Sequence, residues 1–191
     1  YAGTLDPLAS GLLPISLGEA TKFISFFSNS DKVYEATIQL GFKSTTGDAE
    51  GEIVKAQEIV ANPAQLDEVT ESFIGTQDQV PPMHSAIKVN GQPLYKLARK
   101  GKNIDRVARQ IAIHSMLLTK VSDAVVHLSV SCSKGTYIRV LAEDIANALG
   151  TEGYLLSLRR ISIEQVTISD AINFKDLEEL DFDSRLKLLE N

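Results

Sequence analysis

Tyr1-Ala2-Gly3-Thr4-Leu5-Asp6-Pro7-Leu8-Ala9-Ser10-Gly11 opens the chain and holds a single carboxylate inside a tight loop. Gly3 and Gly11 permit backbone angles that other residues avoid, while Pro7 fixes its own φ and disfavours helix at Asp6. A carboxylate held by a stiff neighbour and screened by leucines is a candidate nucleophile or general base. An Asp-Pro pair also suits a simple turn cap, so the loop alone leaves both interpretations open.

Length and composition indicate one α/β or α+β domain rather than a disordered or membrane-embedded chain. The 191 residues are 43% hydrophobic, which is enough for a sizeable core. No apolar run reaches membrane-spanning length, and the single cysteine, Cys132, cannot form an internal disulfide. We therefore expect a cytoplasmic protein. Because the chain begins without Met inside a loop, we also expect an N-terminal strand to be missing.

Hydrophobic periodicity predicts a mixture of strands and helices. Strands are predicted over residues 12–17, 33–40, 109–120, 125–133 and 155–163. Helices are predicted over 18–27, 63–74 and 137–149, with one or two short helices after Asn173. The strand alternation places Tyr34 on the apolar side of its strand. The helical spacing predicts one core-facing set in the first helix: Ala20, Phe23, Ile24 and Phe27.

Basic residues gather in one segment of an otherwise acidic chain. The formal net charge is −6, yet residues 88–109 contain a single acidic residue, Asp105. The basic side chains of this segment are Lys88, Lys96, Arg99, Lys100, Lys102, Arg106 and Arg109. A basic stretch that also contains Tyr95 is typical of an RNA backbone contact. A solvated helix face is the alternative interpretation.

The residue types that most often bind metals are scattered along the chain. The three histidines, His84, His114 and His127, show no ligand spacing, and Cys132 is alone. We expect His127 to have a structural role on a strand and Cys132 to lie in the core. The sequence therefore predicts no metal site.

Several separated blocks resemble the TruB family of tRNA pseudouridine synthases. They are Gly3-Thr4-Leu5-Asp6-Pro7 with Ala9-Ser10-Gly11-Leu12-Leu13-Pro14; Lys32-Val33-Tyr34 leading to Thr46-Gly47-Asp48-Ala49-Glu50-Gly51; residues 81–101; Cys132-Ser133-Lys134-Gly135-Thr136-Tyr137-Ile138-Arg139; and Leu158-Arg159-Arg160. The resemblance covers essentially the whole chain.

The resemblance implies a role for each of five residues. Asp6 matches the essential catalytic aspartate of the family, and Arg139 matches the arginine that pairs with it. Tyr34 matches the tyrosine that stacks on the target base, and Tyr137 a second active-site tyrosine. Leu158 matches a leucine that packs under the flipped nucleotide. Since burial disfavours a charged carboxylate, the Arg139 guanidinium would keep Asp6 anionic.

The resemblance also implies an architecture. We expect an α+β fold, a mixed and largely antiparallel sheet with flanking helices, as in the pseudouridine synthase catalytic fold. Residues 1–191 would form one catalytic domain, with an RNA-facing insertion at about 76–110 and no clear C-terminal PUA domain.

The implied reaction is isomerisation of the T-arm uridine at tRNA position 55 to pseudouridine. It needs base flipping and the aspartate, but no cofactor and no metal. The implied partner is the tRNA T-arm stem-loop, bound through Lys88, Lys96, Arg99, Lys100 and Lys102 by a monomer that contacts no membrane. The alternatives are a non-catalytic RNA-binding or RNA-folding module and a related synthase that acts on ribosomal RNA.

The chain departs from the family pattern at a few positions. The family often has His in place of Tyr1 and Tyr in place of His84, and Ser44-Thr45 replaces a more usual Thr-Asp pair. These differences concern the fine contacts to RNA. Attack of Asp6 on the sugar, attack on the base and removal of a ribose proton all stay open.

Overall fold

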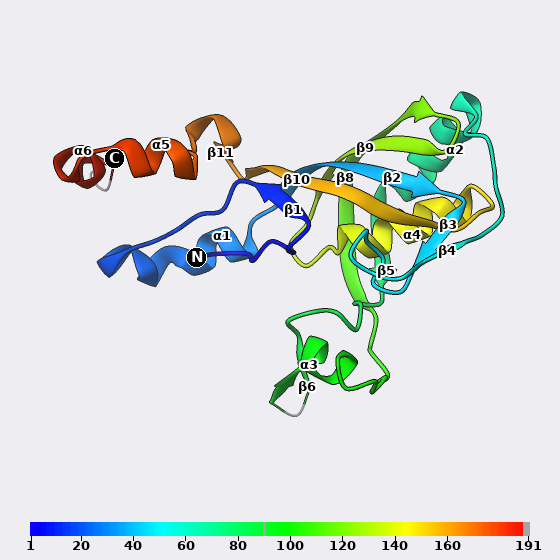
Figure 1. The fold of residues 1–191 in the computed structure, drawn as a ribbon, viewed down its shortest axis with the longest axis horizontal. Helices are drawn as coiled ribbons and strands as arrows, with labels where there is room; N and C mark the ends of the chain where they lie inside the picture. Colours follow the sequence, from blue (N-terminus) through cyan, green and yellow to red (C-terminus); the bar gives the residue numbers. More distant parts are fainter. Residues whose placement is uncertain (90, 189–191) are drawn as a thin grey trace.

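A seven-stranded mixed sheet forms the centre of the computed structural model, which describes residues 1–89 and 91–188 (Figure 1). The strands follow the order β1 (Ala9–Gly11), β10 (Gly153–Ile163), β2 (Lys32–Leu40), β9 (Val125–Cys132), β8 (Arg109–Ser122) and β5 (Gly75–Gln79), and β11 (Val166–Thr167) also pairs with β10. Only the β1–β10 pair is parallel; the other pairs of this sheet are antiparallel. The expected α+β fold with a largely antiparallel sheet is confirmed.

One face of the sheet carries the core. Along β2, alternate side chains are buried, from Lys32 and Tyr34 through Leu40, because successive residues of a strand point to opposite faces. The helices α4 (Ile138–Ala148) and α2 (Pro63–Phe73) contribute Leu141, Ile145, Leu66 and Val69 to the same core. The predicted helix after Asn62 is present, and the Asn62 side chain accepts a hydrogen bond from the backbone N–H of Ala64.

The opposite face of the sheet is polar. On it, Glu35 forms an ion pair with His127 at 2.7 Å and accepts a hydrogen bond from the Ser129 hydroxyl at 2.9 Å. The structural role expected for His127 fits this position. Cys132, on the same strand as His127, points to the opposite face of the sheet and is fully buried, as expected of a core residue.

Two expectations for the N-terminal segment are wrong. Residues 12–17 form no strand; the short strand β1 comes earlier, at Ala9–Gly11. Leu12 still donates its backbone N–H to the carbonyl of Arg160, but Pro14 has no N–H with which to continue such pairing.

The predicted helix over 18–27 is also different. It divides into a 3₁₀ helix, η1 (Gly18–Phe23), and a short helix, α1 (Ile24–Asn29), neither of which buries a residue. Phe23 is 72% exposed, so the predicted core face is wrong. Figure 1 shows this segment reaching away from the sheet.

The C-terminal segment after the sheet is helical. It contains η2 (Ile168–Asp170), α5 (Phe174–Glu179) and α6 (Phe182–Lys187), in agreement with the predicted short helices. In the part of the chain that the structure describes, no helix has the length and apolarity needed to cross a membrane.

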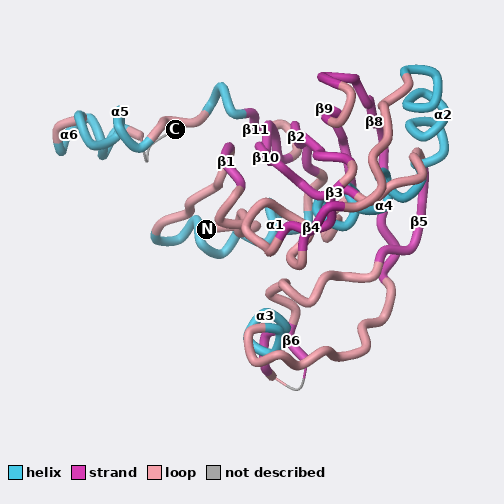
Figure 2. Tube along the Cα trace, turned by 45° about the vertical axis from the view of Figure 1, so that its right-hand side comes forward, coloured by secondary structure: helices cyan, strands magenta, loops and turns pink. Residues whose placement is uncertain are grey.

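The segment between β5 and β8 leaves the sheet as a separate arm. Residues 80–108 form β6 (Lys88–Val89), β7 (Gln92–Pro93) and α3 (Leu94–Ala98), and Figures 1 and 2 show them standing off one edge of the body. A second small hairpin consists of β3 (Phe42–Ser44) and β4 (Ile53–Lys55). Asn90, which belongs to the basic segment, lies outside the described residues.

Candidate active site

The loop that carries Asp6 is closed by its own backbone. The N–H of Ala9 donates to the carbonyl of Asp6 at 2.8 Å, and the N–H of Ala2 donates to the carbonyl of Pro14 at 3.0 Å. The loop therefore returns to the edge of the sheet, where β1 pairs with β10. The Asp6 side chain is left 39% exposed, so one side of its carboxylate is open to a ligand.

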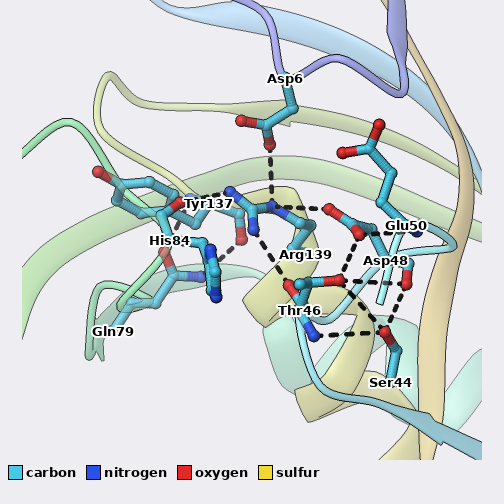
Figure 3. A network of polar contacts seen from close by, with 9 residues as sticks. All are labelled: Asp6, Ser44, Thr46, Asp48, Glu50, Gln79, His84, Tyr137 and Arg139. Atoms are coloured by element: carbon cyan, nitrogen blue, oxygen red, sulfur yellow. Dashed lines mark hydrogen bonds and ion pairs between the residues drawn. The ribbon is translucent and has the colours of Figure 1, made fainter. Parts of the chain in front are cut away.

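Arg139 binds the Asp6 carboxylate from the first turn of α4. Its Nε donates to Asp6 Oδ2 at 2.9 Å, its Nη1 to the carbonyl of Thr46 at 3.0 Å, and its Nη2 to the carbonyl of His84 at 2.8 Å (Figure 3). The guanidinium thus joins three segments of the chain that are far apart in sequence. Its side chain is only 5% exposed, so the buried guanidinium holds the Asp6 carboxylate in a fixed orientation.

A second carboxylate, that of Asp48, lies near the same guanidinium nitrogen as Asp6. Asp48 Oδ2 is 3.6 Å from Arg139 Nε, and the Asp48 side chain is 4% exposed. Its Oδ1 accepts hydrogen bonds from the Thr46 hydroxyl at 2.5 Å and from the N–H of Glu50 at 3.1 Å. Sequence reasoning did not select Asp48 as a site residue, although its Thr-Gly-Asp segment was part of the resemblance.

Tyr34 lies beneath the Asp6 loop on β2. Its side chain belongs to the core cluster and is 8% exposed. Burial raises the pKa of its phenol, the positive charge of the neighbouring Arg160 partly opposes that effect, and the negative charge of Asp6 raises the pKa further.

Tyr137 is held by its backbone at the start of α4. The Gln79 side chain accepts the N–H of Tyr137 at 2.8 Å and donates to its carbonyl at 3.1 Å. Gln79 is 4% exposed and is the last residue of β5, where the arm leaves the sheet. The start of the arm therefore fixes the backbone of Tyr137. Burial raises the pKa of the Tyr137 phenol, an effect that the adjacent Ser85 hydroxyl opposes.

Leu158 is placed in the sheet directly below the Asp6 loop. On β10 it lies between Ala9 of β1 and Ala36 of β2, and it is 8% exposed. The structure therefore brings Asp6, Tyr34, Tyr137, Arg139 and Leu158 to one region, where the Asp6 loop, the sheet and α4 meet.

The five predicted RNA-binding cations lie apart from this cluster, on the projecting arm. They are all exposed: Lys88, Lys96, Arg99, Lys100 and Lys102. The Arg99 guanidinium lies 5.6 Å from the ring centroid of Tyr95. Arg106, by contrast, donates to the carbonyl of Pro81 at 3.3 Å and supports the arm itself.

Within residues 1–89 and 91–188, no group of three or more His, Cys, Asp or Glu side chains has a geometry that would hold a metal ion. His84 contributes its backbone carbonyl to Arg139 rather than its imidazole. The chemistry available at the site is that of one accessible carboxylate, a buried guanidinium and two phenols.

Comparison with known proteins places the chain in a family. Residues 1–138 match the model of the TruB family pseudouridylate synthase (N terminal domain). The tRNA pseudouridine synthase B of Psychrobacter cryohalolentis is 48% identical over 186 residues, which are 97% of this chain and 52% of that protein. The enzyme of the same name from Blochmanniella floridana is 43% identical over 190 residues, covering 100% of this chain and 74% of that protein.

A solved structure shares the fold. The structure described as "Crystal Structure of a Cbf5-Nop10-Gar1 Complex" superposes with a TM-score of 0.69 at 26% identity, covering 92% of this chain and 44% of that chain. The chain spans about half the length of the Psychrobacter relative and 61% of the relative from Ralstonia pickettii, which is 46% identical. From the matched family model and these relatives, the chain belongs to the TruB family of pseudouridylate synthases.

Proposed function

We propose that this chain is the catalytic part of a tRNA pseudouridine synthase that converts the T-arm uridine at tRNA position 55 to pseudouridine. The observation that carries the proposal is the ion pair between Asp6 and Arg139. The guanidinium is buried at 5% exposure while the carboxylate is 39% exposed, so the pair presents an oriented anion to a ligand. The relatives' names supply the tRNA substrate class.

The reaction is an isomerisation. The bond from uracil nitrogen to the ribose breaks, the base rotates, and a bond from uracil carbon to the ribose forms, with no net change of oxidation state. Asp6 serves as the nucleophile or base for the first bond cleavage. Attack on the sugar, attack on the pyrimidine ring and removal of a ribose proton each require an anionic carboxylate, and the Arg139 guanidinium lies 2.9 Å from that of Asp6.

The target base must leave its stack to reach Asp6. We assign Tyr34 to one face of the flipped base, where stacking contributes about 1 to 3 kcal/mol. Leu158 packs below the nucleotide, and Tyr137 positions the base or transfers a proton as the base rejoins the sugar. A tyrosine phenol is protonated at neutral pH and can donate a proton or hydrogen bond, and burial raises the pKa of Tyr137 further.

The cations of the projecting arm bind the phosphates of the T-arm stem-loop. Lys88, Lys96, Arg99, Lys100 and Lys102 are exposed on a segment that otherwise carries little negative charge, so they offset the net charge of −6 locally. The single cysteine is a buried free thiol, which suits a reducing cytoplasm. We further propose that the protein acts as a monomer and without a metal.

The experiment that tests the function compares three versions of the intact protein on T-arm RNA, with pseudouridine detected by carbodiimide labelling. Asp6→Asn should lose more than about 1000-fold in rate while its tRNA dissociation constant changes less than threefold. Asp67→Asn, an exposed carboxylate on α2, is the matched control and should keep wild-type activity.

Three results would contradict the proposal. Near-wild-type turnover by Asp6→Asn would remove the aspartate from the chemistry. Tight tRNA binding without any conversion by the wild-type protein would favour the non-catalytic RNA-binding alternative. Conversion of ribosomal RNA but not of tRNA would favour the related-synthase alternative.

A further inference from the structure

Arg160 is a buried cation on the strand next to the Asp6 loop. It lies on β10 with 1% exposure and is among the largest fully buried side chains of the protein. Among the described residues, no ion pair joins it to a carboxylate; the hydrogen-bond acceptors of its guanidinium are two backbone carbonyls. A buried guanidinium needs well-placed acceptors to offset lost hydration, so these contacts determine where it sits.

The two carbonyls lie on either side of Asp6 in sequence. Arg160 Nη2 donates to the carbonyl of Gly3 at 2.8 Å, and Nε donates to the carbonyl of Leu12 at 2.8 Å. In return, the carbonyl of Arg160 accepts the N–H of Leu12 at 2.9 Å. One residue therefore holds both ends of the loop whose middle presents the carboxylate.

The loop is built to approach this residue closely. A Cβ added to Gly3 would lie 3.1 Å from Arg160 Nη1, and one added to Gly11 would lie 2.2 Å from the Arg160 carbonyl oxygen. Gly11 also has a φ of +103°, a backbone conformation that side chains disfavour. The loop therefore approaches Arg160 closely at two separate residues, Gly3 and Gly11.

Arg160 also contacts the other side of the site. On β2 its register partner is Tyr34, so the two side chains lie next to each other on the same face of the sheet, and the charge of Arg160 lowers the pKa of the Tyr34 phenol against the effect of burial. The same residue therefore binds the loop that carries Asp6 and lies beside the tyrosine assigned to base stacking. Arg159, its neighbour in sequence, points to the opposite face of the sheet and is exposed.

From these contacts we propose that Arg160 is a positioning residue, which fixes the distance between the Asp6 carboxylate and the ring of Tyr34 and so places the flipped uridine against its attacking group. This inference rests on the proposed pseudouridine synthase function. Bound reactants lose on the order of 100-fold in rate when a remote change displaces them by about 1 Å. Arg160 would therefore act on the chemical step, through the loop, without touching the RNA.

The test uses the intact protein with Arg160→Gln, Arg160→Lys and the matched control Arg159→Gln. Single-turnover pseudouridine formation on T-arm RNA gives the rate of the chemical step, and filter binding gives the tRNA dissociation constant. Hydrogen exchange over residues 1–14 reports loop closure independently of activity. We expect Arg160→Gln to lose about 100-fold in single-turnover rate, with less than a threefold change in tRNA affinity.

Exchange in residues 1–14 should accelerate in Arg160→Gln, while exchange in α4 stays at the wild-type rate. If Arg160→Gln does not fold, the Arg160→Lys variant tests the inference instead. Lysine keeps the charge but cannot donate to the carbonyls of Gly3 and Leu12 together from a planar fork, so at least a tenfold rate loss is expected. Arg159→Gln should match the wild type in all three measurements.

The inference is overturned if Arg160→Lys and Arg160→Gln, where folded, keep wild-type single-turnover rates. It is also overturned if their rate loss is matched by an equal loss of tRNA affinity, since that would place the residue in binding. An inactive wild-type protein that binds tRNA would instead contradict the proposed function, and the hydrogen-exchange comparison would still report whether Arg160 holds the loop.

Discussion

Asp6 and Arg139 are 133 positions apart in sequence, and Asp6 Oδ2 lies 2.9 Å from Arg139 Nε. Their exposures differ: the arginine side chain is 5% exposed and the aspartate 39%. Thr46 and His84 supply backbone carbonyls for the remaining guanidinium nitrogens, so the arginine is oriented before any ligand binds. The carboxylate is the half of the pair that can meet a substrate.

We expect Arg139→Lys to lose at least about 100-fold in turnover with little change in tRNA affinity. A lysine ammonium cannot donate at once to Asp6 and to two carbonyls in a planar arrangement, so the carboxylate loses its orientation. Steady-state kinetics on T-arm RNA measure the effect. Arg185→Lys on α6, an exposed arginine, is the control, and equal turnover in the two variants would contradict this role.

Gly11→Ala should disrupt the Asp6 loop. The new Cβ would meet the Arg160 carbonyl oxygen at 2.2 Å, a contact that backbone atoms cannot relieve without separating β1 from β10. We expect a loss of about 2 kcal/mol or more in unfolding free energy, together with loss of activity. Urea denaturation and the pseudouridine assay measure the two effects.

The matched control for that substitution is Gly18→Ala. Gly18 also has a positive φ, of +55°, but its added Cβ would meet nothing within 4 Å. The substitution then costs only the unfavourable backbone conformation, about 1 kcal/mol of unfolding free energy, and activity should persist. Equal effects at the two positions would show that close packing against Arg160 is not what makes Gly11 necessary.

Removing charge from the arm should weaken tRNA binding without slowing the chemical step. Lys96→Gln with Lys100→Gln removes two exposed cations, so the slope of log K against log salt should fall by about 1 to 2. Single-turnover rates at saturating protein should stay at the wild-type value. Lys175→Gln on α5 serves as the control, and an unchanged salt slope in the double variant would exclude these lysines from phosphate contacts.

Stability should decline in alkali through Cys132. Burial raises the pKa of its thiol from 9.0 to about 11, so the folded state favours the protonated form. That stabilisation is complete below pH 9 and is lost as the pH rises toward 11, because the unfolded chain then releases its proton first. Between pH 8 and 11 the unfolding free energy of the wild type should fall by about 2 kcal/mol more than that of Cys132→Ala.

Urea denaturation at several pH values measures this difference. The burial that raises the pKa also predicts that iodoacetamide modifies Cys132 slowly at pH 8 in the folded protein and quickly in urea. Parallel stability curves for the wild type and Cys132→Ala would contradict the assignment.

Much of the fold was predictable because local pattern and tertiary burial agree. The strict alternation around Tyr34 and the spacing of Leu141 and Ile145 describe surfaces that the protein does bury. The pattern failed at Phe23, which sits in a helical apolar spacing yet is 72% exposed. Amphipathic spacing shows which face a helix would bury, but not whether another element is there to cover it.

The polar contacts of the site were predictable only in part. The pairing of Asp6 with Arg139 was expected from family resemblance, because no local pattern relates residues so far apart. Asp48 and Arg160 were not selected, although both are almost fully buried. Arg160 does have a signal in the sequence, since it shares the phase of Leu158 on its strand; what the sequence lacks is the identity of its partners, which are backbone carbonyls.

The contacts made by Gln79 and His84 divide the arm into two portions. The inner portion, residues 80–85, follows Gln79, which is bonded to Tyr137, and contains His84, which is bonded to Arg139; the outer portion, residues 86–108, carries the exposed cations. If the proposed function holds, exchanging the outer portion while the inner portion is left untouched would retarget the protein to another RNA. On the same proposal, variation in the outer portion would alter the choice of substrate without altering the chemical step.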